Sequence, residues 1–459
     1  MIFFLFLVSF VYYFVASLLL DLSLHHNGWD LGIFLQILYN NIHGNFFQYS
    51  FRPFNFLGDH FSPILIFLSP LGLLKLTWPI LAVQALALSG AVATLYLLSQ
   101  QILKNRLLSL LLSLSFALNP YTLQIINFDF HPDAFFPLFS FSIIYSLLKK
   151  RYFLAYLFFS SLLITREDTL LLILPLSVVA FLKLKEKRFA VVTFASAFSY
   201  FLLVNLIVMP LIRGPFGAAL TEHYSYLGES VGQIVIKALK NPFLIASKLG
   251  EHDFLGTLLK FFGSNGFIAL LNPLVLISSL PIFLSHLLSN VPLRFTLSGH
   301  YSAQPLIPLY LAAVFSLASA NIKIAAYPRL RIFLPIYLAV FTILSFSFFS
   351  PFPPSFAADP YRFTPNSHTR LFFKLKNLIP EEAAVSIQSN LLPFFAFRRE
   401  VYQFPRVDGA DYIFLDQKGA VSEQSLEAGY RERLERLGPL GFKLIKDEDG
   451  FKIYRRLNK

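Results

Sequence analysis

Long apolar stretches separated by short clusters of basic residues are the feature that most limits how this chain can fold. Apolar residues make up 56% of the sequence and charged residues only 14%. A soluble domain has about half apolar and a quarter charged residues. A single water-facing core could not bury this much apolar surface, so lipid is the expected solvent. The pattern predicts an all-α polytopic membrane protein.

The positions of the charged residues predict the topology. Short loops rich in Lys and Arg stay cytoplasmic, so the four basic clusters are expected on one side. Acidic residues alternate with these clusters along the chain and are expected on the opposite face. The net charge of +12 therefore reflects topology, and nucleic-acid binding is not expected. The four clusters are Lys104 to Arg106, Lys149 to Arg151, Lys183 to Arg188, and Lys323 to Arg331.

We predict about eleven crossings for residues 1–350, with a cytoplasmic amino terminus and an external carboxyl terminus. The first apolar stretch, residues 2–20, lacks the basic region and the small-residue cleavage site of a signal peptide, so it is expected to be a retained membrane helix. External loops are expected at 21–77 and 210–251. They contain a re-entrant stretch at 61–76 and an amphipathic helix within 221–250. The predicted helices are 2–20, 78–103, 107–126, 134–148, 152–165, 169–182, 190–209, 252–264, 266–288, 303–319 and 329–350.

The composition changes after Pro351. Residues 351–365 are rich in proline and predict a linker, and residues 366–459 predict a small soluble α/β domain on the extracytoplasmic side. Its expected elements are strands at 383–387 and 412–415, a helix at 426–437, and a hairpin of 442–445 and 451–454. The segment has no glycine-rich phosphate loop, so we assign it no chemistry.

The stretch 152–182 predicts a water-filled recess in the membrane. As one helix it would be about 46 Å long, well beyond a hydrocarbon core of roughly 30 Å. A hairpin that turns at 165–168 keeps both flanking clusters cytoplasmic, but each limb is then only about 21 Å long. The charged tip, Arg166, Glu167 and Asp168, is therefore expected to lie in a recess. Alternatively, these residues form a self-neutralising ion pair at a helix turn.

Asp30 begins a predicted helix with one polar stripe. Gln36, Asn40 and His43 recur at helical spacing on an otherwise apolar segment. A purely structural interpretation makes Asp30 the N-cap and Gly44 the C-cap. A capping carboxylate can also face a cavity, so both interpretations stay open.

Asp129, His131 and Asp133 place two carboxylates and an imidazole within five residues, between two predicted helices. These groups could hold a divalent metal or a phosphate-bound cation. Alternatively, Asp133 simply caps the next helix. The absence of cysteine excludes disulfides, thiolate metal sites and a cysteine nucleophile.

Two further pairs are candidates. Asp59 and His60 lie in a predicted loop, where such a pair is either solvated or part of a site. His300 and Tyr301 precede the tenth predicted helix, and both residue types are also common at the membrane interface.

Several of these motifs together resemble a prokaryotic family of predicted membrane proteins, labelled domain of unknown function two thousand and seventy-nine. The resemblance covers most of the chain up to about residue 320, and the segments 384–389 and 411–412 resemble the family's tail. Asp133 departs from the family pattern, in which Glu or another residue is commoner. The motifs are Asp30-Leu31-Gly32-Ile33-Phe34 with Gln36 and Asn40, Gly58-Asp59-His60-Phe61-Ser62-Pro63, Asp129-Phe130-His131-Pro132, Glu167-Asp168 and His300-Tyr301.

That family is in turn distantly similar to the C-type (GT-C fold) glycosyltransferases. The resemblance implies an enzyme of the prokaryotic plasma membrane that moves a sugar from a polyprenyl-phosphate donor to an acceptor on the extracytoplasmic face. It implies that Asp30 is the general base and that Asp129 or Asp133 assists it. Arg166, with His131 or His60, would stabilise the leaving phosphate. No cofactor is certain, although a divalent cation is an option. The other residues expected to bind substrate are Gln36, Asn40, Asp59, Glu167, Asp168, His300 and Tyr301.

Two other classes of function remain open. A transporter or channel would also place charges within the membrane, but it would more naturally show paired broken helices in related halves, and the sequence has no internal repeat. A non-catalytic assembly or sensor protein would use the external domain for binding and leave the acidic residues structural.

Overall fold

The membrane part of the chain is a bundle of helices. The computed structural model describes residues 1–459 except 217–222, 252, 325–327, 419–427 and 458–459. The helices of the amino-terminal half are α1 (Ile2–Leu22), α2 (Trp29–Ile42), α3 (Leu65–Leu68), α4 (Trp78–Leu103), α5 (Arg106–Ala117), α6 (Pro120–Phe128), α7 (Phe135–Leu148), α8 (Tyr152–Leu163), α9 (Leu170–Val178), α10 (Lys187–Leu203) and α11 (Met209–Arg213).

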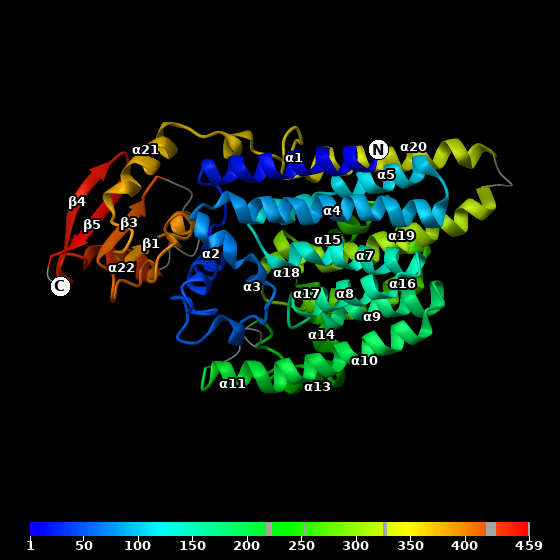
Figure 1. Ribbon diagram of the computed structural model, residues 1–459, viewed down its shortest axis with the longest axis horizontal. Coiled ribbons are helices and arrows are strands. Elements are labelled where there is room, and N and C mark those ends of the chain that lie inside the picture. Colours follow the sequence, from blue (N-terminus) through cyan, green and yellow to red (C-terminus); the bar gives the residue numbers. More distant parts are fainter. Residues whose placement is uncertain (217–222, 252, 325–327, 419–427, 458–459) are drawn as a thin grey trace.

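The second half adds shorter helices and two long ones. The long α1, α4 and α20 run roughly along one direction, whereas α2 lies at the end of the bundle nearest the carboxyl-terminal sheet (Figure 1). The helices of this half are α13 (Val231–Lys240), α14 (Pro242–Gly250), α15 (Phe254–Gly263), α16 (Pro273–Ser278), α17 (Leu280–Leu287), α18 (Pro292–Phe295), α19 (Ala303–Ile324), α20 (Pro328–Phe349), α21 (Ser367–Leu375) and α22 (Ala428–Glu435).

The described residues form six helices or helix pairs that are long and apolar enough to cross a membrane. Shorter apolar helices accompany them, among them the two limbs α8 and α9. The multi-pass helical class is therefore supported, whereas the count of about eleven crossings stays a prediction. The six are Ile2–Leu22, Trp78–Leu103, Arg106–Phe128, Lys187–Arg213, Pro292–Ser319 and Ile332–Phe349.

Two predicted helices are interrupted. The stretch 266–288 was expected to be one helix, and this prediction is wrong: it divides into a 3-10 turn (Ile268–Leu271), α16 and α17. Pro273 and Pro281 lack the backbone N–H that a helix interior needs, and each lies at the start of a new helix instead. Pro120 likewise separates α5 from α6 within the predicted helix 107–126. In contrast, the predicted turn at 165–168 is confirmed, because α8 ends at Leu163 and α9 begins at Leu170.

Side-chain contacts bring three of the basic clusters together. Lys149 Nζ donates to Gln101 Oε1 at 2.7 Å, next to the first cluster, and Lys150 forms an ion pair with Glu186 in the third. The connection between α4 and α5 lies at the end of the bundle away from the carboxyl-terminal sheet (Figure 1). This arrangement agrees with one cytoplasmic end, although the side of the membrane on which it lies remains a prediction.

The carboxyl-terminal part contains a five-stranded mixed sheet with the order β2-β1-β3-β5-β4. β1 pairs in parallel with β2 and β3, and β5 pairs antiparallel with β3 and β4. The sequence predicted four of these strands but missed the short β2. The predicted helix at 426–437 appears as α22, and its first residues lie outside the described part of the chain. The strands are β1 (Val385–Ile387), β2 (Val401–Gln403), β3 (Tyr412–Asp416), β4 (Phe442–Glu448) and β5 (Phe451–Arg456).

α2 packs directly against this carboxyl-terminal part. A Cβ added at Gly32 would lie 2.4–3.0 Å from side-chain atoms of Leu392, so the two segments approach as closely as a glycine permits. Gln36 Nε2 donates to the carbonyl of Arg399 at 3.0 Å. The helix that carries Asp30 is thus fixed in part by residues that follow the last membrane helix. The division into a membrane domain, a linker at 351–365 and a soluble domain remains an interpretation.

We expect the substitution Gly32→Ala to lower the free energy of unfolding by about 1–3 kcal/mol, because the new methyl group must displace Leu392. The matched control is Gly232→Ala in α13, where no atom lies within 4 Å of the added Cβ and the better helix propensity of Ala acts alone. Thermal unfolding of the two variants in detergent measures the difference. Equal stability of the two variants would show that the contact between α2 and Leu392 is not tight.

Candidate functional site

One cavity of about 270 Å³ brings together most of the residues that the sequence singled out. Its wall comes from α2, the loop before α3, the segment before α7, the turn between α8 and α9, α10 and α11, the segment before α13, and the segment before α19. The charged or ionisable residues that line it belong to segments that lie far apart in the sequence. These lining residues are Asp30, Arg52, Asp59, His60, His131, Arg166, Glu167, Asp168, Arg213, His223, Arg294, His300 and Tyr301.

Arg166 lies at the centre of an ion-pair network. Its Nη1 donates to Asp133 Oδ2 at 2.8 Å and its Nη2 to Asp168 Oδ2 at 3.0 Å. Asp168 Oδ1 also accepts a hydrogen bond from Gln304 Nε2 at 3.1 Å. The turn at 165–168 therefore lines the cavity and also contains an ion pair between its own residues, Arg166 and Asp168. A charged tip at a recess and a self-neutralising ion pair are thus compatible interpretations of this sequence. Both terminal nitrogens of this guanidinium are thus used by carboxylates, whereas its buried Nε has no partner among the described residues.

His60 and Glu167 form a second ion pair. His60 Nδ1 lies 3.1 Å from Glu167 Oε1, and the other carboxylate oxygen accepts from the backbone N–H of Phe61 at 2.9 Å. Burial lowers the pKa of His60, but the Glu167 carboxylate outweighs it and raises this pKa to about 9. Burial raises the pKa of Glu167, but His60 outweighs it and lowers this pKa to about 2. Both groups are therefore charged near neutral pH.

Asp30 differs from the other cavity carboxylates because it has no hydrogen bond or ion pair among the described residues. It is the second residue of α2, and Gly28, with a φ of 81°, is the N-cap. The interpretation of Asp30 as an N-cap is therefore wrong, and its carboxylate faces the cavity instead. Burial and the nearby Asp129 raise the pKa of Asp30 to about 7. A carboxylate with such a pKa can accept a proton near neutral pH.

Asp129 does not line the cavity. It is fully buried, and its Oδ2 accepts from the backbone N–H of Gly28 at 2.8 Å. Its Oδ1 lies 3.1 Å from Nδ1 of His26, a residue that the sequence gave no reason to select. Asp129 thus anchors the start of α2, two residues before Asp30. This placement favours a positioning role over a catalytic one.

Asp133 also lies behind the cavity wall. Its Oδ2 binds Arg166, and its Oδ1 lies 3.1 Å from His131 Nδ1. Gln36 and Asn40 face away from the cavity as well: Gln36 Oε1 accepts from the backbone N–H of Ser50 at 2.9 Å, and Asn40 Nδ2 donates to the carbonyl of residue 48 at 2.8 Å. Gln36 and Asn40 of the polar stripe therefore bind the loop that follows α2. Asp133, Gln36 and Asn40 do not line the cavity.

Asp30, His131 and His300 are the one described group whose ligand atoms could meet at a metal ion, since these atoms lie within 4.8 Å of one another. However, the two imidazole rings stack with centroids 3.8 Å apart and an angle of 6°. An ion about 2 Å from a nitrogen of each ring would lie outside both ring planes, where imidazole lone pairs do not point. One ring would have to tilt, and a divalent cation remains a prediction.

The sequence missed four ionisable cavity residues: Arg52, Arg213, His223 and Arg294. Arg213 Nη1 donates to the carbonyl of Gly58 at 3.2 Å, and Arg294 Nη1 lies 2.8 Å from His223 Nδ1. A signal for Arg294 was present. It is the only Lys, Arg, Asp or Glu between Lys260 and Lys323, and it lies in a stretch that the topology places opposite the basic clusters. Glu222, which precedes His223, lies outside the described residues.

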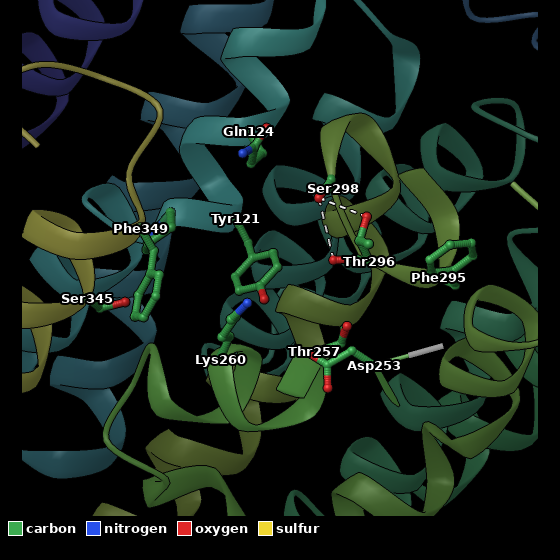
Figure 2. A pocket seen from close by; sticks show the side chains of 11 residues that line it. Tyr121, Gln124, Asp253, Thr257, Lys260, Phe295, Thr296, Ser298, Ser345 and Phe349 are labelled. Atoms are coloured by element: carbon green, nitrogen blue, oxygen red, sulfur yellow. Dashed lines mark hydrogen bonds between the residues drawn. The ribbon is translucent and has the colours of Figure 1, made fainter. Parts of the chain in front are cut away.

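A second cavity has the same volume but different chemistry. Figure 2 shows Lys260 beside Tyr121, and Ser298 hydrogen bonded to Thr296. Asp253 also lines it, but its Oδ1 accepts from the backbone N–H of Gly256 at 2.9 Å and caps α15. Among the described residues no Arg or His lines this cavity. The first cavity is therefore the candidate site.

Comparisons with known proteins give one strong match. The family model described as "Predicted membrane protein (DUF2079)" matches residues 21–450, and this is the family that the sequence motifs resemble. The comparison with curated proteins found no match. Among solved structures, the crystal structure of ArnT from Cupriavidus metallidurans bound to undecaprenyl phosphate is 12% identical, with 99% of this chain and 98% of that chain covered and a TM-score of 0.47. That likeness is too slight to carry an argument.

We expect the substitution Arg166→Gln to lower the free energy of unfolding by about 3–5 kcal/mol, because it leaves the carboxylate of Asp133 buried without its partner. The double variant that adds Asp133→Asn should be more stable than the single variant. Lys150→Gln, which removes an exposed ion pair, is the control and should unfold like the parent protein. Chemical or thermal unfolding in detergent measures all three, and a single variant as stable as the control would contradict the network.

Proposed function

The chain belongs to the DUF2079 family of predicted membrane proteins, and from this premise we propose that it is a membrane glycosyltransferase. It moves a sugar from a polyprenyl-phosphate donor to an acceptor hydroxyl on the extracytoplasmic face of a prokaryotic plasma membrane. The observation that carries the proposal is the carboxylate of Asp30, which no described residue pairs with, in a cavity that also contains cationic side chains. A base and an anion-binding wall are the two features that transfer from a phosphate leaving group requires.

One wall of the cavity supports a lipid-linked donor. Phe201, Met209 and Arg213 line the cavity from the candidate membrane span 187–213. On the same span the side chains of Leu206 and Leu211 are exposed by 61% and 78%. Apolar side chains at this exposure on a membrane span are expected to face lipid. A carrier lipid in the bilayer could therefore reach the charged cavity beside this span.

The reaction follows from the proton that Asp30 can accept. The acceptor hydroxyl oxygen attacks the anomeric carbon of the sugar while the Asp30 carboxylate takes its proton. The bond between that carbon and the phosphate oxygen breaks, and its electron pair stays on the phosphate, which leaves as polyprenyl phosphate. Attack and departure from opposite faces invert the anomeric configuration. The cationic residues of the cavity stabilise the charge that develops on the leaving phosphate.

The protein in proteoliposomes, supplied with a membrane extract that contains lipid-linked sugars and acceptors, should release polyprenyl phosphate, measured by mass spectrometry. Asp30→Asn removes the base and should slow this release by about 10²- to 10⁴-fold. The control is Asp253→Asn in the second cavity, which should leave the release rate unchanged. Unchanged release by Asp30→Asn would refute the base. No release by any form, together with ion or solute flux across the vesicles, would favour a transporter or channel instead.

The rate of transfer should fall about tenfold per pH unit below pH 7, because only the unprotonated Asp30 accepts a proton and its pKa is raised to about 7. Burial and Asp129 and Asp133 raise this pKa, while His60 and Arg166 lower it. His60→Gln should therefore move the acid limb of the profile to higher pH. A limb that stays in place, or moves to lower pH, would show that another group controls it.

A further inference from the structure

The cations of the cavity are not equivalent as anion-binding groups. Arg166 already binds the carboxylates of Asp133 and Asp168, and His60 is paired with Glu167. A phosphate that approached Arg166 would have to compete with two carboxylates held at 2.8 and 3.0 Å. The residue that the sequence selected for phosphate is therefore poorly available for it.

Arg294 is buried without a carboxylate partner. Its side chain is 5% exposed, it lines the cavity, and no described Asp or Glu forms an ion pair with it. Its Nη1 donates to His223 Nδ1 at 2.8 Å, which fixes the remaining proton of the neutral His223 ring on Nε2. Its Nε, which is also buried, has no hydrogen-bond partner within the described part of the chain. Burial of an uncompensated charge is costly, and a bound anion removes that cost.

Two aromatic rings fix the guanidinium in place. The Arg294 Cζ lies 5.6 Å from the ring centroid of Tyr224 and 5.2 Å from that of Tyr301. Tyr224 is itself anchored by a hydrogen bond from its hydroxyl to the carbonyl of Ser285. These contacts hold the cation over two rings, and Nη1 is used by His223. Among the described residues no acceptor binds Nε or Nη2, and the planar fork of these two nitrogens matches two oxygens of one phosphate.

We propose that Arg294 is the phosphate-binding residue of the cavity, that its ligand is a phosphate ester, and that Arg166 is a positioning residue. The anion site stands on the burial and contacts of Arg294, whereas the identification of the ester as the prenyl phosphate of a carrier lipid rests on the proposed function. Inorganic phosphate presents the same oxygens without the lipid.

Calorimetric titration of the full chain in phosphatidylcholine nanodiscs tests the assignment with two probes, a short-chain prenyl phosphate and inorganic phosphate. Arg294→Gln should weaken binding of the prenyl phosphate by about 10- to 100-fold, and Arg294→Lys, which keeps the charge but loses the fork, by an intermediate factor. The folded fraction of Arg166→Gln should bind within about threefold of the parent protein. The reverse order for the two arginines would overturn the assignment.

The two probes identify the source of the phosphate. A prenyl phosphate that binds at least about tenfold more tightly than inorganic phosphate is the expected result, because the apolar chain adds burial beside the 187–213 span. Equal affinities would overturn the assignment of a lipid ester.

A second measurement uses only the parent protein and so does not depend on how the variants fold. Phenylglyoxal modifies accessible guanidinium groups, and mass spectrometry reports the modification of each arginine. Prenyl phosphate should slow the modification of Arg294 at least severalfold and leave that of Arg362, outside this cavity, unchanged. Equal rates at Arg294 with and without the probe would overturn the site.

Failure of this inference can be told apart from failure of the proposed function. Asp30→Asn should lose transfer but keep prenyl phosphate binding, whereas Arg294→Gln should lose both. Binding that Arg294→Gln retains, together with transfer that Asp30→Asn loses, overturns Arg294 alone. Binding that Arg294→Gln loses, together with transfer that Asp30→Asn retains, overturns the base and leaves the phosphate site.

Discussion

The ion pairs of Arg166 are the interaction on which the rest of the site depends. Its guanidinium joins the segment before α7, through Asp133, to the turn between α8 and α9, through Asp168. Asp168 in turn binds Gln304 near the start of α19. A single buried charge beside apolar helices would be expensive, whereas one cation shared by two carboxylates is tolerated. This network allows two helices too short to cross the bilayer to end in a charged turn, and the turn forms one wall of the cavity.

The hydrogen bonds of the site also explain why its aspartates have different roles. Asp129 and Asp133 are four positions apart and looked equivalent in the sequence. The helix α6 ends at Phe128, just before Asp129, and the backbone at Asp129 is extended, so one carboxylate reaches Gly28 at the start of α2 and the other reaches Arg166. Each therefore holds a neighbouring element in place. Asp30 has no partner among the residues that the structure describes, which leaves its carboxylate available to accept a proton.

The convergence of the site could be predicted from the sequence, but its pairings could not. Charged side chains are costly to expose to lipid, so Asp30 and Glu167, both predicted opposite the basic clusters, were expected to line one cavity. Which carboxylate binds which cation depends on backbone directions at helix ends, and a sequence pattern does not give them. Arg294 was overlooked because the topology rule looks for clusters, and a lone arginine forms none. The helix expected at 266–288 failed for a local reason, because two prolines outweigh a continuous apolar run.

The close contact of α2 with the carboxyl-terminal part limits which amino-acid substitutions the two segments can accept. Backbone atoms of residues 389 and 390 would lie 2.2–2.9 Å from a Cβ at Gly28, and Leu392 fills the space beside Gly32. Substitutions at these positions of α2 and of the carboxyl-terminal part are therefore expected to be accepted in matching pairs. A chimera that takes its tail from another family member should need α2 from the same parent, even though the hydrogen-bonded Gln36 and Arg399 are 363 positions apart in the sequence.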